Sequence, residues 1–352
     1  MTVRALQRHA PAAVGGLLLG AAIVWVAYKA AGSGFGATGS FPQFIIITLN
    51  GLTIAGLYFI IASGFTLIFG LMRVVNMAHG SLYLFGGYIA FELQGRFSGA
   101  QGASTSGFGG GNVSVGDWVL PLVLATLIVG AVGLAMHQLL LRWNQGQELR
   151  QALITIAISI IAADQMLAHF GGVAEDIKLP TSLDKPLSLH VYGLSYGRFR
   201  LLVLVIAIIV GGALMLTFRK TRFGMIVRAG VDDRAMVSAL GVNIQLVFAG
   251  AFFLGAALAG LGGVFGGTMV ALGPGEDSAF LLNSLIVVII GGMGSLGGAA
   301  VGAVALGLVQ SYAQVYLVFG GTDYTFYAIL LTFALLIAVL VVRPLGLFGR
   351  PA

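Results

Sequence analysis

The chain contains no cysteine, so disulfides and thiolate metal sites are excluded from all of its 352 residues. Charged residues are also scarce. Asp, Glu, Lys and Arg make up only 9% of the sequence, whereas 58% is hydrophobic and the mean hydropathy is +1.00. A soluble protein of this length needs many more charges to cover its surface. The composition therefore excludes a soluble globular protein and indicates a membrane protein.

A phosphate-binding loop is missing as well. The run GGMGSLGG at Gly291–Gly298 has glycines, but it lacks the Lys-Ser/Thr pair that must follow them, and G-x-x-x-x-G-K-[ST] occurs nowhere. We interpret the run as a close-packed bend in a discontinuous helix. No hydrolytic triad or metal constellation is recognisable. We therefore expect no enzyme activity and no cofactor on this chain, and any ATP must be hydrolysed on another chain.

The hydrophobic residues gather in stretches that approach or exceed the roughly 20 residues needed to cross a bilayer as a helix. These stretches are too long and too uniformly apolar for barrel strands, so the spans are helices. We predict an all-α, polytopic transmembrane bundle of about 9–10 helices, in one permease-type domain covering 1–352. The expected spans are 11–31, 44–69, 78–93, 118–141, 152–170, 201–218, 246–271, 299–319 and 324–342, with a shorter crossing near 283–290.

The basic residues predict the orientation of this bundle. With segments 95–116 and 171–200 outside and 221–243 inside, about twelve of the 18 Lys and Arg residues lie inside and about six outside. Both termini are then cytoplasmic, and 1–40 forms an extra N-terminal helix. The alternation holds only if the short segment near 283–298 crosses the membrane.

Polar residues interrupt the apolar sequence at two places, 74–88 and 283–298, where we expect short or broken helices. Asn76, His79, Asn283 and Ser284 are the candidate substrate-path residues, because broken helices with polar residues can line a cavity. In the alternative reading, Asn76 caps the following helix and His79 satisfies backbone carbonyls. The sequence leaves both readings open.

Four ionisable residues, Glu92, His137, Asp164 and His169, fall within or beside the predicted spans. Charges inside a membrane are costly and often functional. Pairing near the membrane interface is the simpler interpretation, because Asp164 and His169 lie toward one end of their span and Glu92 lies near Arg96.

The segment Thr221–Asn243, TRFGMIVRAGVDDRAMVSALGVN, is one of few clearly polar islands in the chain. Its second half predicts a short helix that is N-capped by Asp232 or Asp233 and ended by Gly241 in a left-handed turn. A cytoplasmic helix tethered to membrane spans on both sides is suited to transmit force from a soluble partner. An ordinary solvated loop is the alternative.

Four segments resemble the first permease subunit of branched-chain amino acid ABC importers. They are NGLTIAGLYFIIASGFTLIFGLMRVVNMAHG (Asn50–Gly80), Thr221–Asn243, FFLGAALAGLGGVFGG (Phe252–Gly267) and VVIIGGMGSLGGAAVGAVALG (Val287–Gly307). The resemblance runs from about Phe41 to the C-terminus. It implies a permease that passes branched-chain or related amino acids, or other small polar organic solutes, across the bacterial inner membrane by alternating access.

The resemblance also implies partners. These are a second homologous permease, two ATP-binding cassette subunits that bind ATP and Mg, a soluble substrate-binding protein and membrane lipid, with no nucleic acid. The polar island would be the coupling helix that docks on an ATPase subunit, a role carried onto Asp232, Asp233, Arg234, Ala235, Ala239 and Gly241.

The chain departs from the family pattern at Ser81, where a Glu commonly follows the His-Gly pair, at the extra N-terminal helix and at the long Gly-rich segment 95–116. The first departure bears on the substrate. The alternative function is a channel or ion-coupled secondary transporter for a small solute such as urea or an amide. A coupled transporter needs an ionisable relay facing its cavity.

Overall fold

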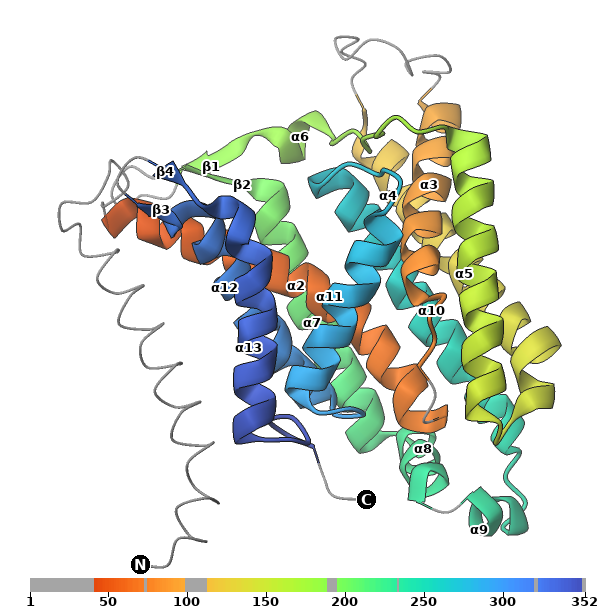
Figure 1. Ribbon diagram of the computed structural model, residues 1–352. Coiled ribbons are helices and arrows are strands. Elements are labelled where there is room, and N and C mark those ends of the chain that lie inside the picture. The colour runs from red at the N-terminus through yellow and green to blue at the C-terminus, as the bar shows by residue number, and fades with distance from the viewer. Residues whose placement is uncertain are drawn as a thin grey trace, which may run out of the picture.

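The computed structural model describes residues 41–72, 75–98, 113–188, 195–232, 234–319 and 322–349, which form an almost wholly helical bundle (Figure 1). The all-α prediction is confirmed. The helices are α2 (Phe41–Met72), α3 (His79–Phe97), α4 (Val115–Met136), α5 (Glu148–Phe170), α6 (Thr181–Asp184), α7 (Arg198–Lys220), α8 (Arg222–Asp232), α9 (Arg234–Ala239), α10 (Ile244–Met269), α11 (Glu276–Gly291), α12 (Leu296–Tyr316) and α13 (Ala328–Val342).

The remaining regular structure is short. A π-helical turn (His137–Leu141) and a 3-10 turn (Arg142–Asn144) extend α4, and a second 3-10 turn (Thr325–Tyr327) leads into α13. Strands β1 (Pro186–Ser188) and β2 (Ser195–Gly197) pair antiparallel, with Leu187 opposite Tyr196. Strands β3 (Val318–Phe319) and β4 (Thr322–Asp323) form a second antiparallel pair.

Seven helical stretches in the described part of the chain are long and apolar enough to cross a membrane: Pro42–Met72, Val115–Asn144, Glu148–Phe170, Arg198–Lys220, Ile244–Met269, Leu296–Tyr316 and Thr325–Val342. Helices α3 and α11 are not among them, although they run between the same two ends of the bundle (Figure 1). The N-terminal span predicted within 1–40 lies outside the described residues.

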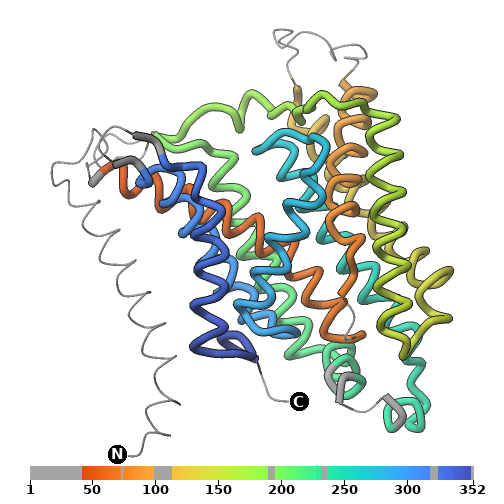
Figure 2. The backbone as a smooth tube through the Cα atoms, in the orientation of Figure 1, coloured from red at the N-terminus to blue at the C-terminus, as the bar shows by residue number. Residues whose placement is uncertain are grey.

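The helices differ in how much of each is buried by the rest of the chain, whose path Figure 2 traces. About half of the residues in the apolar stretches of α2 and α10 are buried by the rest of the chain, whereas only 11% of those in α5 and α7 are buried. Small residues let the central helices approach closely. A Cβ at Gly263 of α10 would collide with the Tyr83 carbonyl of α3, and one at Gly86 of α3 would collide with the Gly260 backbone. Such contacts through small faces are typical of membrane helices.

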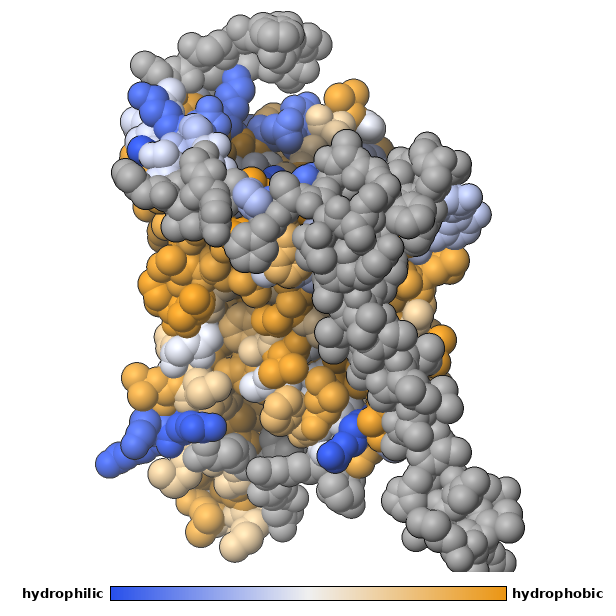
Figure 3. Space-filling model, turned by 90° about the vertical axis from the view of Figure 1, so that its left-hand side faces the viewer, coloured by the Kyte–Doolittle hydropathy of each residue, from blue (hydrophilic) through white to orange (hydrophobic). Residues whose placement is uncertain are grey.

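The connections gather at two ends. The α4–α5 connection, α8, α9 and the described C-terminal residues lie at the lower end of Figure 1, and α6, β1–β2 and β3–β4 lie at the upper end. An apolar band separates polar side chains at the two ends (Figure 3). Because α11 runs from the upper end to the lower one, the chain alternates between the ends as the topology prediction requires.

Two predicted elements differ from the structure. The polar island contains two helices rather than one, and Asp232 is the last residue of α8 instead of an N-cap; Asp233 lies outside the described residues. The missed helix α8 was readable from Phe223, Ile226 and Val227, which repeat at helical spacing. Helix α11 begins at Glu276 rather than near Asn283, because the left-handed Gly275 starts it inside a stretch that reads as polar.

Candidate functional site

The connection from α2 to α3 is non-helical but buried. Asn76 and Ala78 are 3% and 0% exposed. The side-chain oxygen of Asn76 accepts the Ala78 N–H at 3.1 Å, and its carbonyl accepts the His79 N–H at 3.2 Å. The Met77 N–H donates to the Thr155 hydroxyl of α5 at 3.2 Å. Irregular backbone at membrane depth is tolerated only where protein or water satisfies it, and here protein does so.

His79 begins α3 and is fully buried. Its Nε2 lies 3.0 Å from the Ile61 carbonyl of α2, and its ring meets Phe65 edge-on. Asn76 therefore bonds the start of α3, and His79 bonds a backbone carbonyl. These are the contacts expected from the alternative interpretation, in which both residues have structural roles. A role for either residue in the substrate path stays a prediction.

Asn283 belongs to a network of polar side chains on four helices. The Tyr58 hydroxyl of α2 donates to Gln310 Oε1 of α12 at 2.6 Å. Asn283 of α11 donates to the Tyr58 oxygen at 3.2 Å and accepts from Gln310 Nε2 at 3.2 Å. Gln310 Nε2 also lies 3.4 Å from the Thr332 hydroxyl of α13. Within apolar surroundings this network ties the four helices together.

The sequence analysis named Asn283 as a candidate substrate-path residue, which stays a prediction, and it did not predict this network or the part of Tyr58, Gln310 and Thr332 in it. The available signal was a few polar residues scattered through the apolar spans, which does not reveal which of them meet. Ser284 is fully buried, and its hydroxyl has no hydrogen-bond partner within the described residues. No hydrogen bond described in the structure joins Asn283 or Ser284 to Asn76 or His79.

Residues 174–178, which we call the outer strap, cross the upper end of the bundle. Glu175 and Leu272 exchange backbone hydrogen bonds of 2.8 and 2.7 Å, and the Ile177 N–H donates to the Gly267 carbonyl at 2.9 Å. The side-chain amide of Gln94 bonds both backbone groups of Lys178 at 2.9 Å. The strap thus joins the end of α3 to the α10–α11 turn.

The outer strap also carries charge. Partial burial, together with the adjacent Asp176 carboxylate, raises the pKa of Glu175. Ile177 of the strap and Leu272 of the α10–α11 turn are buried, at 3% and 0% exposure. The strap is therefore bonded through its backbone to α10 and to the α10–α11 turn at this end of the described bundle.

At the lower end, α8 and α9 hold the predicted coupling residues. Ala239 is exposed at the end of α9, and Gly241 has a φ of +79°, so the predicted left-handed turn is present. Asp232 ends α8, whereas Arg234 and Ala235 begin α9. Their roles in coupling stay predictions.

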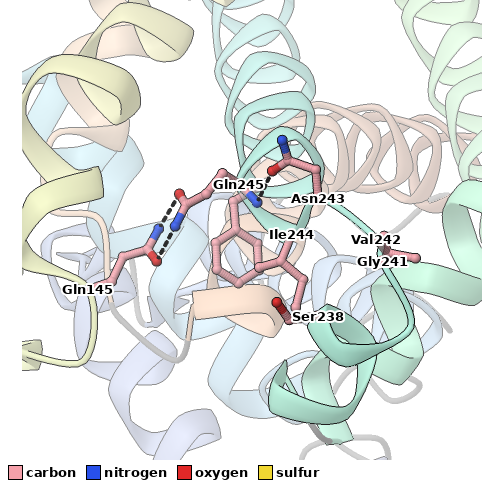
Figure 4. Close-up of a pocket in the computed structure, with 8 residues that line it drawn as sticks. Gln145, Ser238, Gly241, Val242, Asn243, Ile244 and Gln245 are labelled. Atoms are coloured by element: carbon pink, nitrogen blue, oxygen red, sulfur yellow. Dashed lines mark hydrogen bonds between the residues drawn. The ribbon is translucent and has the colours of Figure 1, made fainter.

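An open groove of about 620 Å³ lies beside α9 (Figure 4). Its lining residues come from the α4 end, from α9 and from the start of α10; they are Gln145, Ser238, Gly241, Val242, Asn243, Ile244, Gln245 and Phe248. Gln145 and Gln245 exchange two hydrogen bonds of 2.9 Å, and Asn243 caps α10. The groove thus joins the polar island to two membrane helices.

The described residues contain no group of His, Cys, Asp or Glu that could hold a metal ion. Their chemistry is instead that of buried amides and hydroxyls and of exposed polar helices.

Comparison with known proteins agrees with this architecture. Residues 47–340 match the family described as "Branched-chain amino acid transport system / permease component". The chain is 28% identical over 319 residues to the high-affinity branched-chain amino acid transport system permease protein LivH of Salmonella typhimurium, with 88% of this chain and 97% of that protein covered. No solved structure matches the chain.

Two further relatives are similar over most of the chain. LivH of Escherichia coli K12 is 29% identical over 319 residues, which are 88% of this chain and 97% of that protein. BraD of Pseudomonas aeruginosa, another high-affinity branched-chain amino acid permease protein, is 30% identical over 312 residues, 86% of this chain and 95% of BraD. The chain is a multi-pass membrane protein that belongs to the family of permease components of branched-chain amino acid transport systems.

Proposed function

We propose that the chain is the permease subunit of an ABC importer that carries branched-chain or related amino acids, or other small polar organic solutes, across a bacterial inner membrane. Family membership over residues 47–340 carries the proposal. The chain works with a second homologous permease, two ATP-binding cassette subunits and a soluble substrate-binding protein. ATP and Mg bind to the cassette subunits, because this sequence lacks a phosphate-binding loop.

In this proposal the lower end and both termini face the cytoplasm. Basic residues support the orientation, because those near the lower end outnumber those near the upper end. The lower set is Arg142, Arg150, Arg219, Lys220, Arg222, Arg228, Arg234 and Arg343, and the upper set is Arg96, Lys178, Lys185, Arg198 and Arg200.

The cassette subunit docks on the coupling residues Asp232, Asp233, Arg234, Ala235, Ala239 and Gly241, beside the groove of Figure 4. The hydrogen-bonded Gln145–Gln245 pair supports this placement, because it links the groove to α10 and to the end of α4. A partner can shift a conformational equilibrium only if its contact differs between the two states. A small helix fixed to membrane spans supplies such a contact.

Solute passes by alternating access along a path that includes Asn76, His79, Asn283 and Ser284. A solute that enters from outside must pass the end that the outer strap crosses, and in this proposal the strap releases during the cycle. The strap is held by a few hydrogen bonds, whereas the helices below it are held by continuous backbone hydrogen bonding. This difference supports the assignment of the strap as the part that opens.

The proposal is tested by reconstituting the chain with its cassette, permease and binding-protein partners and measuring uptake of radiolabelled leucine. We expect uptake that requires both ATP and the binding protein and that stops when the phosphate-loop lysine of the cassette subunit is replaced. Uptake down the leucine gradient without ATP would instead establish the channel or secondary transporter.

A further inference from the structure

Helix α5 exposes a carboxylate, that of Asp164, on a membrane-spanning helix, where contact with lipid is energetically costly. The helix has 23 residues and so spans about 34 Å, and Asp164 lies about 8 Å from its midpoint. A hydrocarbon layer of about 30 Å centred on this helix would include that depth, although Asp164 lies toward one end of the span. Asp164 and the adjacent Gln165 are both exposed on the surface of this chain. The ion pairs of the described residues do not include Asp164.

The exposed residues of α5 form one continuous face. Ala157, Ile160, Ile161, Asp164 and Ala168 are all exposed, and each lies three or four residues from another member of the set, which places them on one side of the helix. The two alanines leave room for another helix to approach, and Asp164 lies between them. Small residues beside a polar one are the usual composition of helix contacts within membranes.

Helix α7 provides a contrast within the same chain. It has the same length as α5, and each is only 11% buried. Between Leu201 and Leu216 its exposed positions are all apolar or glycine, including Val205, Ile208 and Ile209. This face suits lipid. Exposed small residues, Gly212 and Ala213, occur on α7 as well, so the polar pair Asp164 and Gln165 is what distinguishes the exposed face of α5.

We infer that the exposed face of α5 contacts the second permease subunit, one of whose membrane helices supplies hydrogen-bond donors toward Asp164. The inference rests on the proposed function, which requires a second membrane subunit. The soluble partners in that proposal do not reach this depth, so the second permease is the partner that can cover the carboxylate. Ionisable residues at membrane depth are normally paired within protein or face water.

The test compares Ile161→Cys on α5 with Ile208→Cys on α7. The two isoleucines are 62% and 66% exposed, and the chain has no cysteine of its own. Each variant is labelled with benzophenone maleimide in membranes that contain the full complex, irradiated, and its products identified by mass spectrometry. We expect position 161 to couple to the second, homologous permease and position 208 to couple to lipid, and coupling of position 161 to another copy of this chain would overturn the inference.

Coupling of position 161 to lipid alone, or of position 208 to the permease, would overturn the inference. ATP-dependent uptake is measured in the same membranes before irradiation. If uptake depends on ATP and position 161 couples only to lipid, this interface is refuted and the proposed function stands. If uptake does not depend on ATP, the proposed function itself is refuted.

Asp164 has its own test, in which the amount of second permease recovered with the purified chain is measured. We expect Asp164→Leu to lower it about threefold, the effect of one average interhelical polar contact. Asp164→Asn retains hydrogen-bonding capacity and is expected to keep most of the recovery. Unchanged or greater recovery with Asp164→Leu, in a chain that still inserts, would show that α5 faces lipid.

Discussion

At the scale of single residues, the polar network around Gln310 shows how few side chains connect the helices of the bundle. Gln310 accepts from Tyr58 and donates to Asn283, so one amide links α2, α11 and α12. Tyr58 is 7% exposed, so its hydroxyl would lose its hydrogen-bond acceptor in a buried position if Gln310 were replaced by an apolar residue. The network therefore predicts a measurable contribution to stability.

We expect Gln310→Met to destabilise the bundle, because it leaves the Tyr58 hydroxyl and the Asn283 oxygen without this partner. An orphaned buried polar group costs about 1–3 kcal/mol. Thermal unfolding in detergent measures the loss. Asn283→Leu is expected to cost less in the Gln310→Met background than alone, and fully additive losses would show that the two residues do not act together.

A second residue-scale prediction concerns the contact between α3 and α10. A Cβ at Gly263 would overlap the Tyr83 carbonyl, whereas one at Gly212 of α7 meets nothing within 4 Å. We expect Gly263→Ala to destabilise the protein by about 1–3 kcal/mol through overpacking. Gly212→Ala is expected to be neutral or mildly stabilising, because Ala favours helix. Comparison of their unfolding temperatures checks the pair, and equal effects would contradict the close approach of α3 and α10.

At the scale of elements, the coupling segment combines a left-handed glycine with an exposed small residue. We expect Gly241→Val to lose uptake, because a β-branched residue is strained at a φ of +79°. Ala239→Trp is expected to do the same by holding the cassette subunit away. Both variants should insert normally, since neither residue lies within a predicted span.

Co-purification of the cassette subunit and ATPase stimulation by the loaded binding protein are the measurements for these two variants. Ala239→Ser, which is close in size to the native residue, is the control and is expected to behave as wild type. Normal assembly and normal stimulation in both Gly241→Val and Ala239→Trp would place the docking site elsewhere on the chain.

The outer strap can be fixed reversibly to the α10–α11 turn by an engineered disulfide. The Ala174 Cβ lies 3.6 Å from where a Cβ at Gly273 would be, and disulfides need a Cβ separation of about 3.5–4.5 Å. We expect oxidised Ala174→Cys/Gly273→Cys to abolish uptake, and a reducing agent to restore it, because the strap must open in each cycle. The two single-cysteine variants control for oxidation. Full uptake by the oxidised double variant would remove the strap from the path.

The helix break is the third element with a testable role. Asn76 bonds the backbone at the start of α3 and the His79 ring bonds the Ile61 carbonyl of α2, so we expect Asn76→Ala and His79→Ala to lower thermal stability. Uptake assays at permissive temperature separate this role from a role in transport. Unchanged substrate affinity and uptake rate in both variants would restrict these residues to structure.

At the scale of the whole molecule, the proposed orientation can be read from the two ends of the bundle. Val173 beside the outer strap and Leu240 after α9 are 71% and 73% exposed and lie at opposite ends. An impermeant thiol reagent added to intact cells should label Val173→Cys and not Leu240→Cys. Both should react in opened membranes. Labelling of Leu240→Cys from outside would reverse the orientation.

The amino-acid sequence by itself determined the class of protein, most helical spans and the family. Hydropathy reports whether a segment suits lipid, and α2, α10 and α12 therefore begin and end within a few residues of their predicted bounds. The left-handed Gly241 was also predictable, because the signal for a helix end is local. These features depend on neighbours along the chain.

Only the tertiary structure decided which polar residues meet. Tyr58 and Gln310 are 252 positions apart, and their hydrogen bond depends on how α2 and α12 rotate and pack. Glu175 pairs with Leu272 because the α10–α11 turn returns beneath the outer strap. The exposure of Asp164 likewise follows from which face of α5 the other helices leave open. A helix's rotation is set by the whole bundle, since lipid satisfies every apolar face equally well.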